Sequence, residues 1–311
     1  MKEAKLYISP TKGEIPTVLY PIIHKSFQSA LRSSDEQQQQ EDAKFYIALS
    51  GGSLPSLLAN LPRSFLDANI DPQWDRWHVI LADERLVPSS HPDSNLKALR
   101  ESFLDQVPIP KEQIYGIDES LLSSNSEDGH GKQRQRHAEV AEEYENRVFY
   151  GGSGTDEVQN KNKNTSVMLH CVLLGFGPDG HTASLFPNHD LLQERTLLVA
   201  GICDSPKPPP ERITLTQKVF EDMSQTVIFV GAGESKAPIL KDIFERVHLT
   251  NNNNDNDNGG ECKQCVVEMK DISDQRYPCG MIRPRGGGLM YITDSAGGND
   301  LVFTQNCCSL L

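Results

Sequence analysis

Short apolar runs that each end in glycine or charged residues constrain the fold of this 311-residue chain more than any other feature. Between the runs, apolar residues recur every three or four positions, as in amphipathic helices, for example at 13–33 and 138–149. Strands that alternate with helices predict an α/β fold with a mostly parallel sheet and helices on both of its faces. The runs that we assign to strands are 45–50, 77–82, 167–174, 197–202, 213–216, 226–230 and 289–293.

The strand expected at 167–174 continues into Gly175-Phe-Gly-Pro-Asp-Gly-His181, the most distinctive stretch of the chain. Its glycines and Pro178 end the strand and allow tight or left-handed backbone geometry. Asp179 lies two residues before His181, and we expect a helix to begin within 182–186. Because open α/β sheets bind ligands at the carboxyl ends of their strands, the stretch predicts a site around His181. The alternative, from these residues alone, is an ordinary glycine-rich turn with one polar histidine.

Two further strand ends are followed by polar residues. After the strand at 45–50, Gly51-Gly-Ser53 leads toward a helix expected at 57–65. Free backbone N–H groups at such a turn suit an anion, although the Gly-Lys-Ser/Thr ending of a nucleotide-binding loop is missing. Asp83-Glu-Arg85 follows the strand at 77–82 and should lie at the same edge of the sheet. The alternatives here are a purely structural turn and a solvated strand end with a surface ion pair.

Cations occur in two other places that favour anion binding. Lys207-Pro-Pro-Pro-Glu-Arg212 is a stiff, polyproline-like arm with a cation at each end. Cations that are already held in place lose less entropy when they bind a phosphate. Lys236 follows a glycine-rich bend in the first turn of an expected helix, which makes it a second anion contact or, equally, a surface lysine.

Composition excludes several classes of function. The 30 Lys and Arg against 43 Asp and Glu give a formal net charge of −13, which argues against binding to nucleic acid. An anionic small molecule therefore needs a local basic pocket. Seven scattered cysteines, with Cys171 inside an apolar strand, indicate a reducing compartment, and Cys262-Lys-Gln-Cys265 lacks the second pair of a zinc site. Without a signal peptide or a run of about 20 apolar residues, we expect a cytoplasmic protein that is not inserted in a membrane.

The polar segments predict how the chain is divided. We expect one domain over 1–298 with exposed insertions near 123–136, 151–165 and 251–261, and a flexible tail at 299–311. Cys308-Ser-Leu-Leu311 fits a C-a-a-X prenylation pattern, but Ser309 is a poor aliphatic residue and no polybasic run precedes it. Lipidation of Cys308 therefore stays an alternative, to be decided by intact mass. A monomer and a homodimer remain equally open.

Five motifs occur together in an order that resembles the 6-phosphogluconolactonase family. The resemblance covers about residues 10–295 and implies a sugar-phosphate isomerase/deaminase-like α/β fold, Rossmann-like in its layers. It also implies hydrolysis of 6-phosphogluconolactone in the oxidative pentose phosphate pathway, with no metal and no organic cofactor. The motifs are Ser50-Gly-Gly-Ser-Leu-Pro55, Asp83-Glu-Arg85, Gly175-Phe-Gly-Pro-Asp-Gly-His-Thr-Ala-Ser-Leu-Phe-Pro187, Pro208-Pro-Pro-Glu-Arg-Ile-Thr214 and the Gly-x-x-Lys-Ala of Gly233–Ala237.

The resemblance also implies a set of site residues. His181 is the candidate base, because an unperturbed pKa of about 6.5 suits proton transfer near neutrality. Asp179 would hold the imidazole tautomer and stabilise the imidazolium. The sequence does not decide which cations bind the phosphate and which one lies near the carbonyl oxygen. The residues implied in substrate and phosphate binding are Gly51, Gly52, Ser53, Arg85, Lys207, Arg212 and Lys236.

Two other functions compete with lactone hydrolysis. One is that of a sugar-phosphate isomerase or deaminase on the same fold. The related deaminases carry a tyrosine after the Asp-Glu pair and an acidic residue in the Asn-Glu-Pro that follows their histidine. This chain has Arg85 and Leu185-Phe-Pro187 at those places, which favours the lactonase. The other is a non-catalytic, lactonase-like binding protein, which should have lost the histidine or the cations that are present here.

Overall fold

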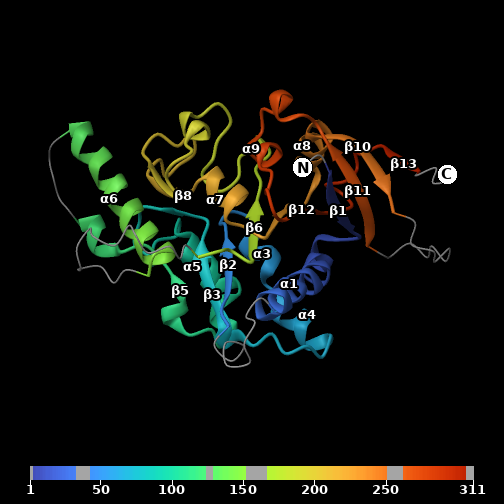
Figure 1. Cartoon of the computed structure of the whole chain (residues 1–311), viewed down its shortest axis with the longest axis horizontal. Coiled ribbons are helices and arrows are strands. Elements are labelled where there is room, and N and C mark those ends of the chain that lie inside the picture. The colour runs from blue at the N-terminus through green and yellow to red at the C-terminus, as the bar shows by residue number, and fades with distance from the viewer. Residues whose placement is uncertain (1–2, 33–42, 124–128, 152–166, 251–261, 306–311) are drawn as a thin grey trace.

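Five of the seven predicted strands belong to a ten-stranded sheet in the computed structural model shown in Figure 1. The structure describes residues 3–32, 43–123, 129–151, 167–250 and 262–305. The strand order is β13-β10-β11-β1-β12-β9-β6-β2-β3-β5. The strands of this sheet are β1 (Glu3–Ser9), β2 (Phe45–Leu49), β3 (Trp77–Leu81), β5 (Ile114–Tyr115), β6 (Cys171–Gly175), β9 (Thr226–Val230), β10 (Phe244–Leu249), β11 (Lys263–Met269), β12 (Gly288–Asp294) and β13 (Phe303–Gln305).

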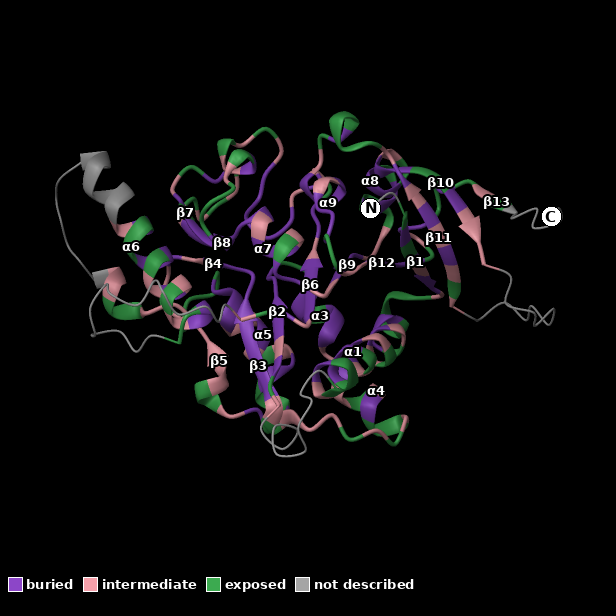
Figure 2. Ribbon diagram, in the orientation of Figure 1, coloured by how far each residue is buried: buried purple, intermediate pink, exposed green. Residues whose placement is uncertain are grey.

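The sheet is mostly parallel, as predicted. From β1 through β12, β9, β6, β2 and β3 to β5, every neighbouring pair is parallel. All five residues of β3 are buried, as in a strand covered on both faces, and Figure 2 shows that β2 beside it is also mostly buried, whereas the edge strand β5 is intermediate. Two strands were not predicted: β11, which is antiparallel to β1, and β10, which is antiparallel to β11 on its other side. The burial of β11 alternates, so it lacks the continuous apolar run that identified the parallel strands.

The register of the parallel strands aligns their carboxyl ends. Leu49 of β2 pairs with Leu81 of β3 and with Leu173 of β6, while Gly175 pairs with Val230 of β9. The residues that follow these strands therefore meet at one edge of the sheet, where parallel α/β sheets place their ligands.

Amphipathic helices cover the sheet where their apolar positions predict them. In α1 the buried residues Leu19, Ile23, Phe27 and Ala30 recur at helical spacing, which confirms the helix expected at 13–33. Figure 1 shows α1, α3 and α4 together, and α1 contacts both of the others. The helices are α1 (Ile15–Arg32), α3 (Leu54–Leu58), α4 (Leu61–Asp67), α5 (Asn95–Ser102), α6 (Gly129–Phe149), α7 (Gln217–Asp222), α8 (Ala237–Ile243) and α9 (Pro278–Met281).

A second, three-stranded sheet has the order β4-β8-β7 and is antiparallel. It consists of β4 (Asp83–Arg85), β7 (Val199–Ile202) and β8 (Arg212–Leu215), and α6 packs against β7 and β8. The runs at 197–202 and 213–216 were therefore wrongly expected in the parallel sheet. The short connection at 203–211 explains the difference, since a parallel pair needs a crossover of a dozen or more residues.

Two local expectations were also wrong, and one helix is longer than expected. Residues 182–186 form no helix: Thr182 and Leu185 exchange backbone hydrogen bonds across a tight turn in which Ala183 has a φ of 48°. The helix expected at 57–65 is divided into α3 and α4, each with a proline in its first turn. Helix α6 begins at Gly129, well before the helix expected at 138–149. The sequence did not identify these first turns, because they lack the apolar spacing that is typical of a helix.

Several sequence predictions concern residues outside the described part of the chain. They are the insertion expected near 151–165, of which only residue 151 is described, the insertion expected near 251–261, and the Cys308 motif. Among the residues that the structure describes, no helix is both long and apolar enough to cross a membrane.

Candidate active site

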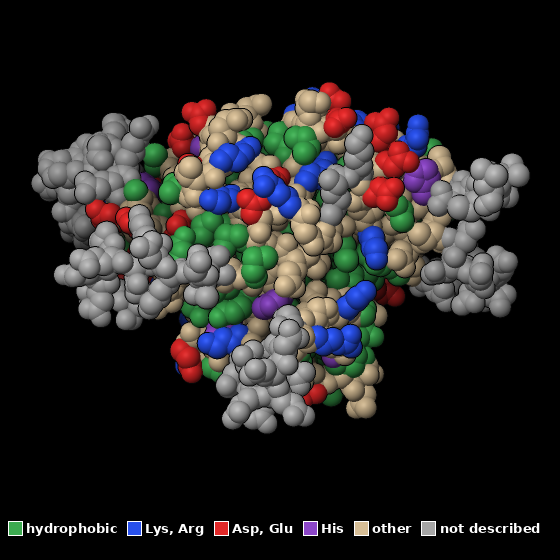
Figure 3. Space-filling model, in the orientation of Figure 1, with side chains coloured by type: hydrophobic (Ala, Val, Ile, Leu, Met, Phe, Trp, Pro, Cys, Tyr) green, Lys and Arg blue, Asp and Glu red, His purple; other side chains and the backbone are tan. Residues whose placement is uncertain are grey.

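A cavity of about 250 Å³ lies at the aligned carboxyl ends of the parallel strands. Turns after β2, β3, β6 and β9 contribute to its wall, as the strand register requires. Seven of the nine residues predicted for the site line it: Gly51, Gly52, Ser53, Arg85, His181, Arg212 and Lys236. Figure 3 shows Lys and Arg side chains gathered near the upper middle of the face drawn there, despite the negative charge of the whole chain.

The imidazole of His181 is fixed on three sides. Its Nδ1 lies 2.5 Å from Oδ1 of Asp179. The ring of Phe186 stacks on it with a centroid distance of 5.0 Å. A Cβ at Gly177 would lie 2.2 Å from Nδ1 and Cε1, so only glycine leaves room for the ring at this place. The glycine-rich stretch therefore serves to bring the backbone close to the histidine as well as to end the strand.

Lys207 lies beside His181 and Asp179. Neither Lys207 nor Asp179 lines the cavity. Nζ of Lys207 is 2.9 Å from Oδ2 of Asp179 and 3.0 Å from Nδ1 of His181. Because Nδ1 faces a carboxylate at 2.5 Å, we assign the proton to Nδ1. The other ring nitrogen, Nε2, then has the lone pair that a base needs.

Burial and charge set the pKa values of this trio. Burial is the main cause that lowers the pKa of His181; Asp179 opposes the shift and Lys207 adds to it. Partial burial alone would raise the pKa of Asp179, but hydrogen bonds from His181 and Lys207 outweigh it and lower the pKa to about 2. At neutral pH the arrangement is therefore a neutral imidazole beside a carboxylate and an ammonium group.

Arg212 fixes the arm that carries Lys207. Its side chain is almost fully buried, at 3% exposed. The guanidinium Nε donates to the carbonyl oxygen of Pro209, and NH2 donates to the carbonyl oxygens of Lys207 and Pro208. NH1 donates to Oγ of Ser184 at 3.3 Å. The arm thus owes its shape to Arg212 as well as to its prolines.

Lys236 reaches the cavity from the turn after β9. It is 7% exposed, and its Nζ donates to the carbonyl oxygen of Phe176 at 2.6 Å. Burial is the main cause that lowers its pKa, and the charge of Lys207 adds to the shift. Within the described part of the chain no carboxylate pairs with Lys236, so its charge is available to an anion in the cavity.

The motif Asp83-Glu-Arg85 forms strand β4, whose alternation separates its side chains. Asp83 and Arg85 line the cavity, whereas Glu84 points the other way. The Glu84 carboxylate accepts hydrogen bonds from the backbone N–H groups of Arg85, Asn95 and Leu96 and from Oγ of Ser94. Burial raises the pKa of Glu84, and these hydrogen bonds oppose the shift. Glu84 therefore fixes the first turn of α5 against β4, a structural role.

Asn95 is a contributor that sequence reasoning missed. Its Nδ2 donates to the carbonyl oxygen of Asp83 at 2.8 Å. Its Oδ1 lies so close to Gly51 that a Cβ there would be 1.8 Å away. Asn95 therefore connects the turn after β2 with β4, and only glycine fits between them. No local pattern in the sequence identifies such a contact between residues more than forty positions apart.

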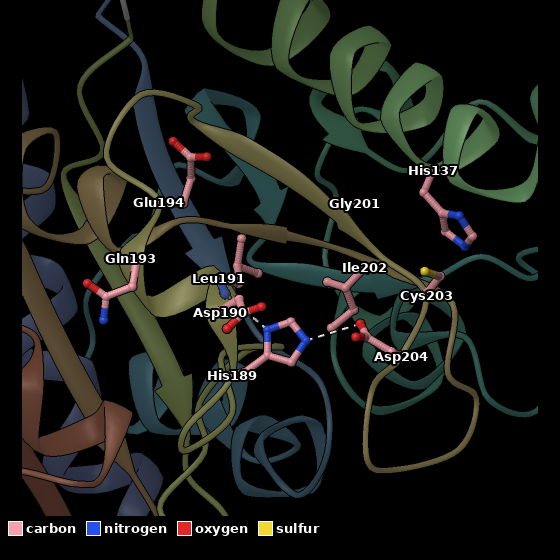
Figure 4. Close-up of a pocket in the computed structure, with 10 residues that line it drawn as sticks. All are labelled: His137, His189, Asp190, Leu191, Gln193, Glu194, Gly201, Ile202, Cys203 and Asp204. Carbon is pink, nitrogen blue, oxygen red and sulfur yellow. Dashed lines mark hydrogen bonds and ion pairs between the residues drawn. The ribbon is translucent and has the colours of Figure 1, made fainter. Parts of the chain in front are cut away.

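A second cavity, of about 560 Å³, is larger but differs in charge (Figure 4). Asp190, Glu194 and Asp204 line it, and its described lining contains no lysine or arginine. His189 in this cavity accepts a hydrogen bond from the backbone N–H of Leu191, and its Nε2 lies 3.1 Å from Oδ1 of Asp204. An acidic wall is unsuited to a sugar phosphate, so the smaller, cationic cavity is the candidate active site.

The fold and this cavity define an α/β protein with an anion-binding site and a carboxylate-paired histidine at its strand ends. A family model described as glucosamine-6-phosphate isomerases/6-phosphogluconolactonase matches residues 23–256, and the chain belongs to this family. It is 36% identical to the 6-phosphogluconolactonase of Rattus norvegicus over 254 residues, which are 81% of this chain and 79% of the relative. Identity to the protein of that name from Homo sapiens is also 36%, over 82% of this chain and 80% of the relative.

Solved structures of both branches of the family share the fold. The 6-phosphogluconolactonase from Trypanosoma cruzi matches with a TM-score of 0.64 at 21% identity, over 96% of this chain and 97% of that one. A monomeric glucosamine-6-phosphate deaminase matches with a TM-score of 0.59 at 14% identity, over 95% of this chain and 99% of that one. Since both branches match, the fold alone does not separate lactonase from deaminase.

Proposed function

We propose that the chain hydrolyses 6-phospho-D-glucono-1,5-lactone to 6-phospho-D-gluconate in the oxidative pentose phosphate pathway. The observation that carries the proposal is the His181–Asp179 pair beside a cavity lined by Arg85, Arg212 and Lys236. Relatives named 6-phosphogluconolactonase, 36% identical over most of the chain, support it. The five cysteines in the described residues are free thiols, which agrees with a reducing compartment, and we expect the reaction to take place in the cytoplasm.

His181 supplies the proton transfers of the reaction. Its Nε2 takes a proton from water as the water oxygen attacks the lactone carbonyl carbon and forms a tetrahedral oxyanion. When the oxyanion collapses, the bond between the carbonyl carbon and the ring oxygen breaks. The imidazolium returns its proton to that oxygen, which becomes the free hydroxyl of the product. Asp179 accepts from Nδ1–H throughout and stabilises the imidazolium.

Lys207 acts through the histidine and is a positioning residue in this scheme. Its ammonium group contacts Asp179 and Nδ1 of His181, and Lys207 is not among the residues that line the cavity. A cation at this place disfavours a second positive charge on the imidazole, which keeps His181 neutral and basic in the resting enzyme. The substrate phosphate is therefore left to the cations on the wall itself.

The wall cations share two tasks, phosphate binding and stabilisation of the oxyanion. Arg212 has most of its guanidinium hydrogen bonds made within the protein. Arg85 donates from NH1 to the carbonyl oxygen of Asp93, but its buried Nε has no acceptor among the described residues. We assign phosphate binding chiefly to Arg85. The backbone N–H groups of Gly51, Gly52 and Ser53 and the hydroxyl group of Ser53 are further donors.

Deamination of an amino-sugar phosphate is the second candidate, because a deaminase shares the fold. In this chain Phe186 occupies the place of the acidic residue that deaminases carry after their histidine, and its ring stacks on His181. The side chain at that position therefore offers no carboxylate to assist the histidine.

Rates on two substrates separate the candidates. We expect freshly prepared 6-phospho-D-glucono-1,5-lactone to disappear faster with the protein than in buffer, and glucosamine 6-phosphate to release no ammonia. Lactone loss at the buffer rate would contradict the proposal and favour a non-catalytic binding protein. Ammonia release would favour the deaminase.

A further inference from the structure

Asp83 is a buried carboxylate on the cavity wall to which the reaction scheme gives no task. The residue is 4% exposed and lies on the cavity face of β4. Its Oδ2 accepts a hydrogen bond from Oγ of Ser184 at 2.9 Å. Its Oδ1 is buried and has no hydrogen-bond donor among the residues that the structure describes. A buried carboxylate oxygen without a donor is unfavourable, so its presence beside a cavity points to a donor on the ligand.

The surroundings of Asp83 fix the orientation of its side chain. Ser184 accepts from NH1 of Arg212 at 3.3 Å and donates to Asp83, so its hydroxyl group connects the two charged residues. The backbone carbonyl of Asp83 is held in turn by Asn95. With Oδ2 bound to Ser184, the carboxylate cannot rotate freely, and Oδ1 is the oxygen left to accept a further hydrogen bond.

The chemistry of the proposed substrate leaves one class of donor. The phosphate group and the lactone carbonyl present acceptor oxygens, and a carboxylate repels both. The ring hydroxyl groups are the only O–H donors of the sugar. We propose that Asp83 binds substrate by accepting a hydrogen bond from one ring hydroxyl of the lactone, and so selects polyhydroxylated lactones. This inference rests on the proposed function. A site built to pair with a substrate hydroxyl strongly rejects an analogue that lacks it.

The test compares Asp83→Asn with the wild type on the full lactone and on analogues that lack one ring hydroxyl. We expect the variant to lose about 10- to 100-fold in kcat/KM on the full lactone, since the acceptor is charged. On the analogue without the contacted hydroxyl, wild type and variant should be equally slow. The penalty should persist on the other analogues. These ratios compare substrates on one protein sample, so they do not depend on how much of the variant is folded.

Asp204→Asn, in the acidic cavity, is the matched control and should leave every rate unchanged. An Asp83→Asn penalty of the same size on every lactone would show a merely structural role and overturn the inference, as would no penalty at all. A wild type that opens none of the lactones would contradict the proposed function instead. In that case the inference is tested by calorimetry of 6-phospho-D-gluconate and its deoxy analogues binding to the wild type and to Asp83→Asn. The variant should bind every ligand more weakly except the one that lacks the contacted hydroxyl. A uniform effect on all ligands would overturn the inference.

Discussion

Two cavities among the described residues each have a histidine beside an aspartate, but only one of these cavities is suited to catalysis. His181 lies 2.5 Å from Asp179, stacked on Phe186, beside a wall with three cations. Nε2 of His189 lies 3.1 Å from Oδ1 of Asp204 in the other cavity, which is also lined by Asp190 and Glu194. The volume of this acidic cavity is about 560 Å³, against about 250 Å³ for the cavity at His181. The positive charge of its wall and a fixed imidazole therefore identify the catalytic cavity, whereas cavity size does not.

The largest expected difference between the two cavities comes from replacing the aspartate beside each histidine by asparagine. Asp179→Asn should lower kcat by about 10²- to 10⁴-fold, because the amide no longer fixes the tautomer or stabilises the imidazolium. Asp204→Asn should leave kcat unchanged. Stopped-flow or pH-stat rates on fresh lactone measure both. Equal losses in the two variants would show that the two pairs are not functionally different.

Removing a cation from the wall should have the next largest effect. Arg85→Ala is expected to raise KM for the phosphorylated lactone about 10- to 100-fold, since a charge-assisted contact to phosphate is lost. The same variant should open unphosphorylated glucono-1,5-lactone as the wild type does. A similar loss on both lactones would instead assign Arg85 to the oxyanion.

The turn after β2 provides a test of stability. Gly51→Ala places a Cβ against Asn95 and should lower the free energy of unfolding by about 1–3 kcal/mol, the usual cost of overpacking. Asn95→Ala removes the atoms that would be contacted, so the double variant should be more stable than the sum of the single losses predicts. Denaturant unfolding of the four proteins measures this coupling. Strict additivity would exclude the contact.

The smallest expected effect is a shift in the pH profile. Lys207→Met removes a cation that lowers the pKa of His181, so that pKa should rise. Since the neutral imidazole is the active form, the acid limb of kcat/KM should move to higher pH. His189→Asn, in the other cavity, should not move it. An acid limb that stays in place or moves to lower pH would contradict the role given to Lys207.

The sequence predicted those parts of the site that depend on local patterns. Apolar runs identified the central strands, and the glycine-rich stretch before His181 identified where the backbone had to leave the sheet. The place of Lys207 could not be predicted, because it depends on hydrogen bonds between Arg212 and the carbonyl oxygens of the arm. The contact of Asn95 with Gly51 was missed because it joins residues more than forty positions apart in the sequence.

The antiparallel sheet β4-β8-β7 shows a related limit. Strands β7 and β8 are apolar runs like those of the parallel strands, and only the length of the connection between them separates the two arrangements. This sheet matters for the site, because it places Asp83 and Arg85 of β4 on the cavity wall beside Arg212 of β8. Partner choice between strands was thus the part of the fold that local patterns did not decide.

The most direct test of the central claim is the rate of lactone hydrolysis above the buffer rate for His181→Ala and for His189→Ala, both checked for folding by circular dichroism. We expect a loss of about 10²- to 10⁴-fold in kcat for His181→Ala. We expect no change for His189→Ala. A His181→Ala variant that hydrolyses the lactone as fast as the wild type would contradict the account.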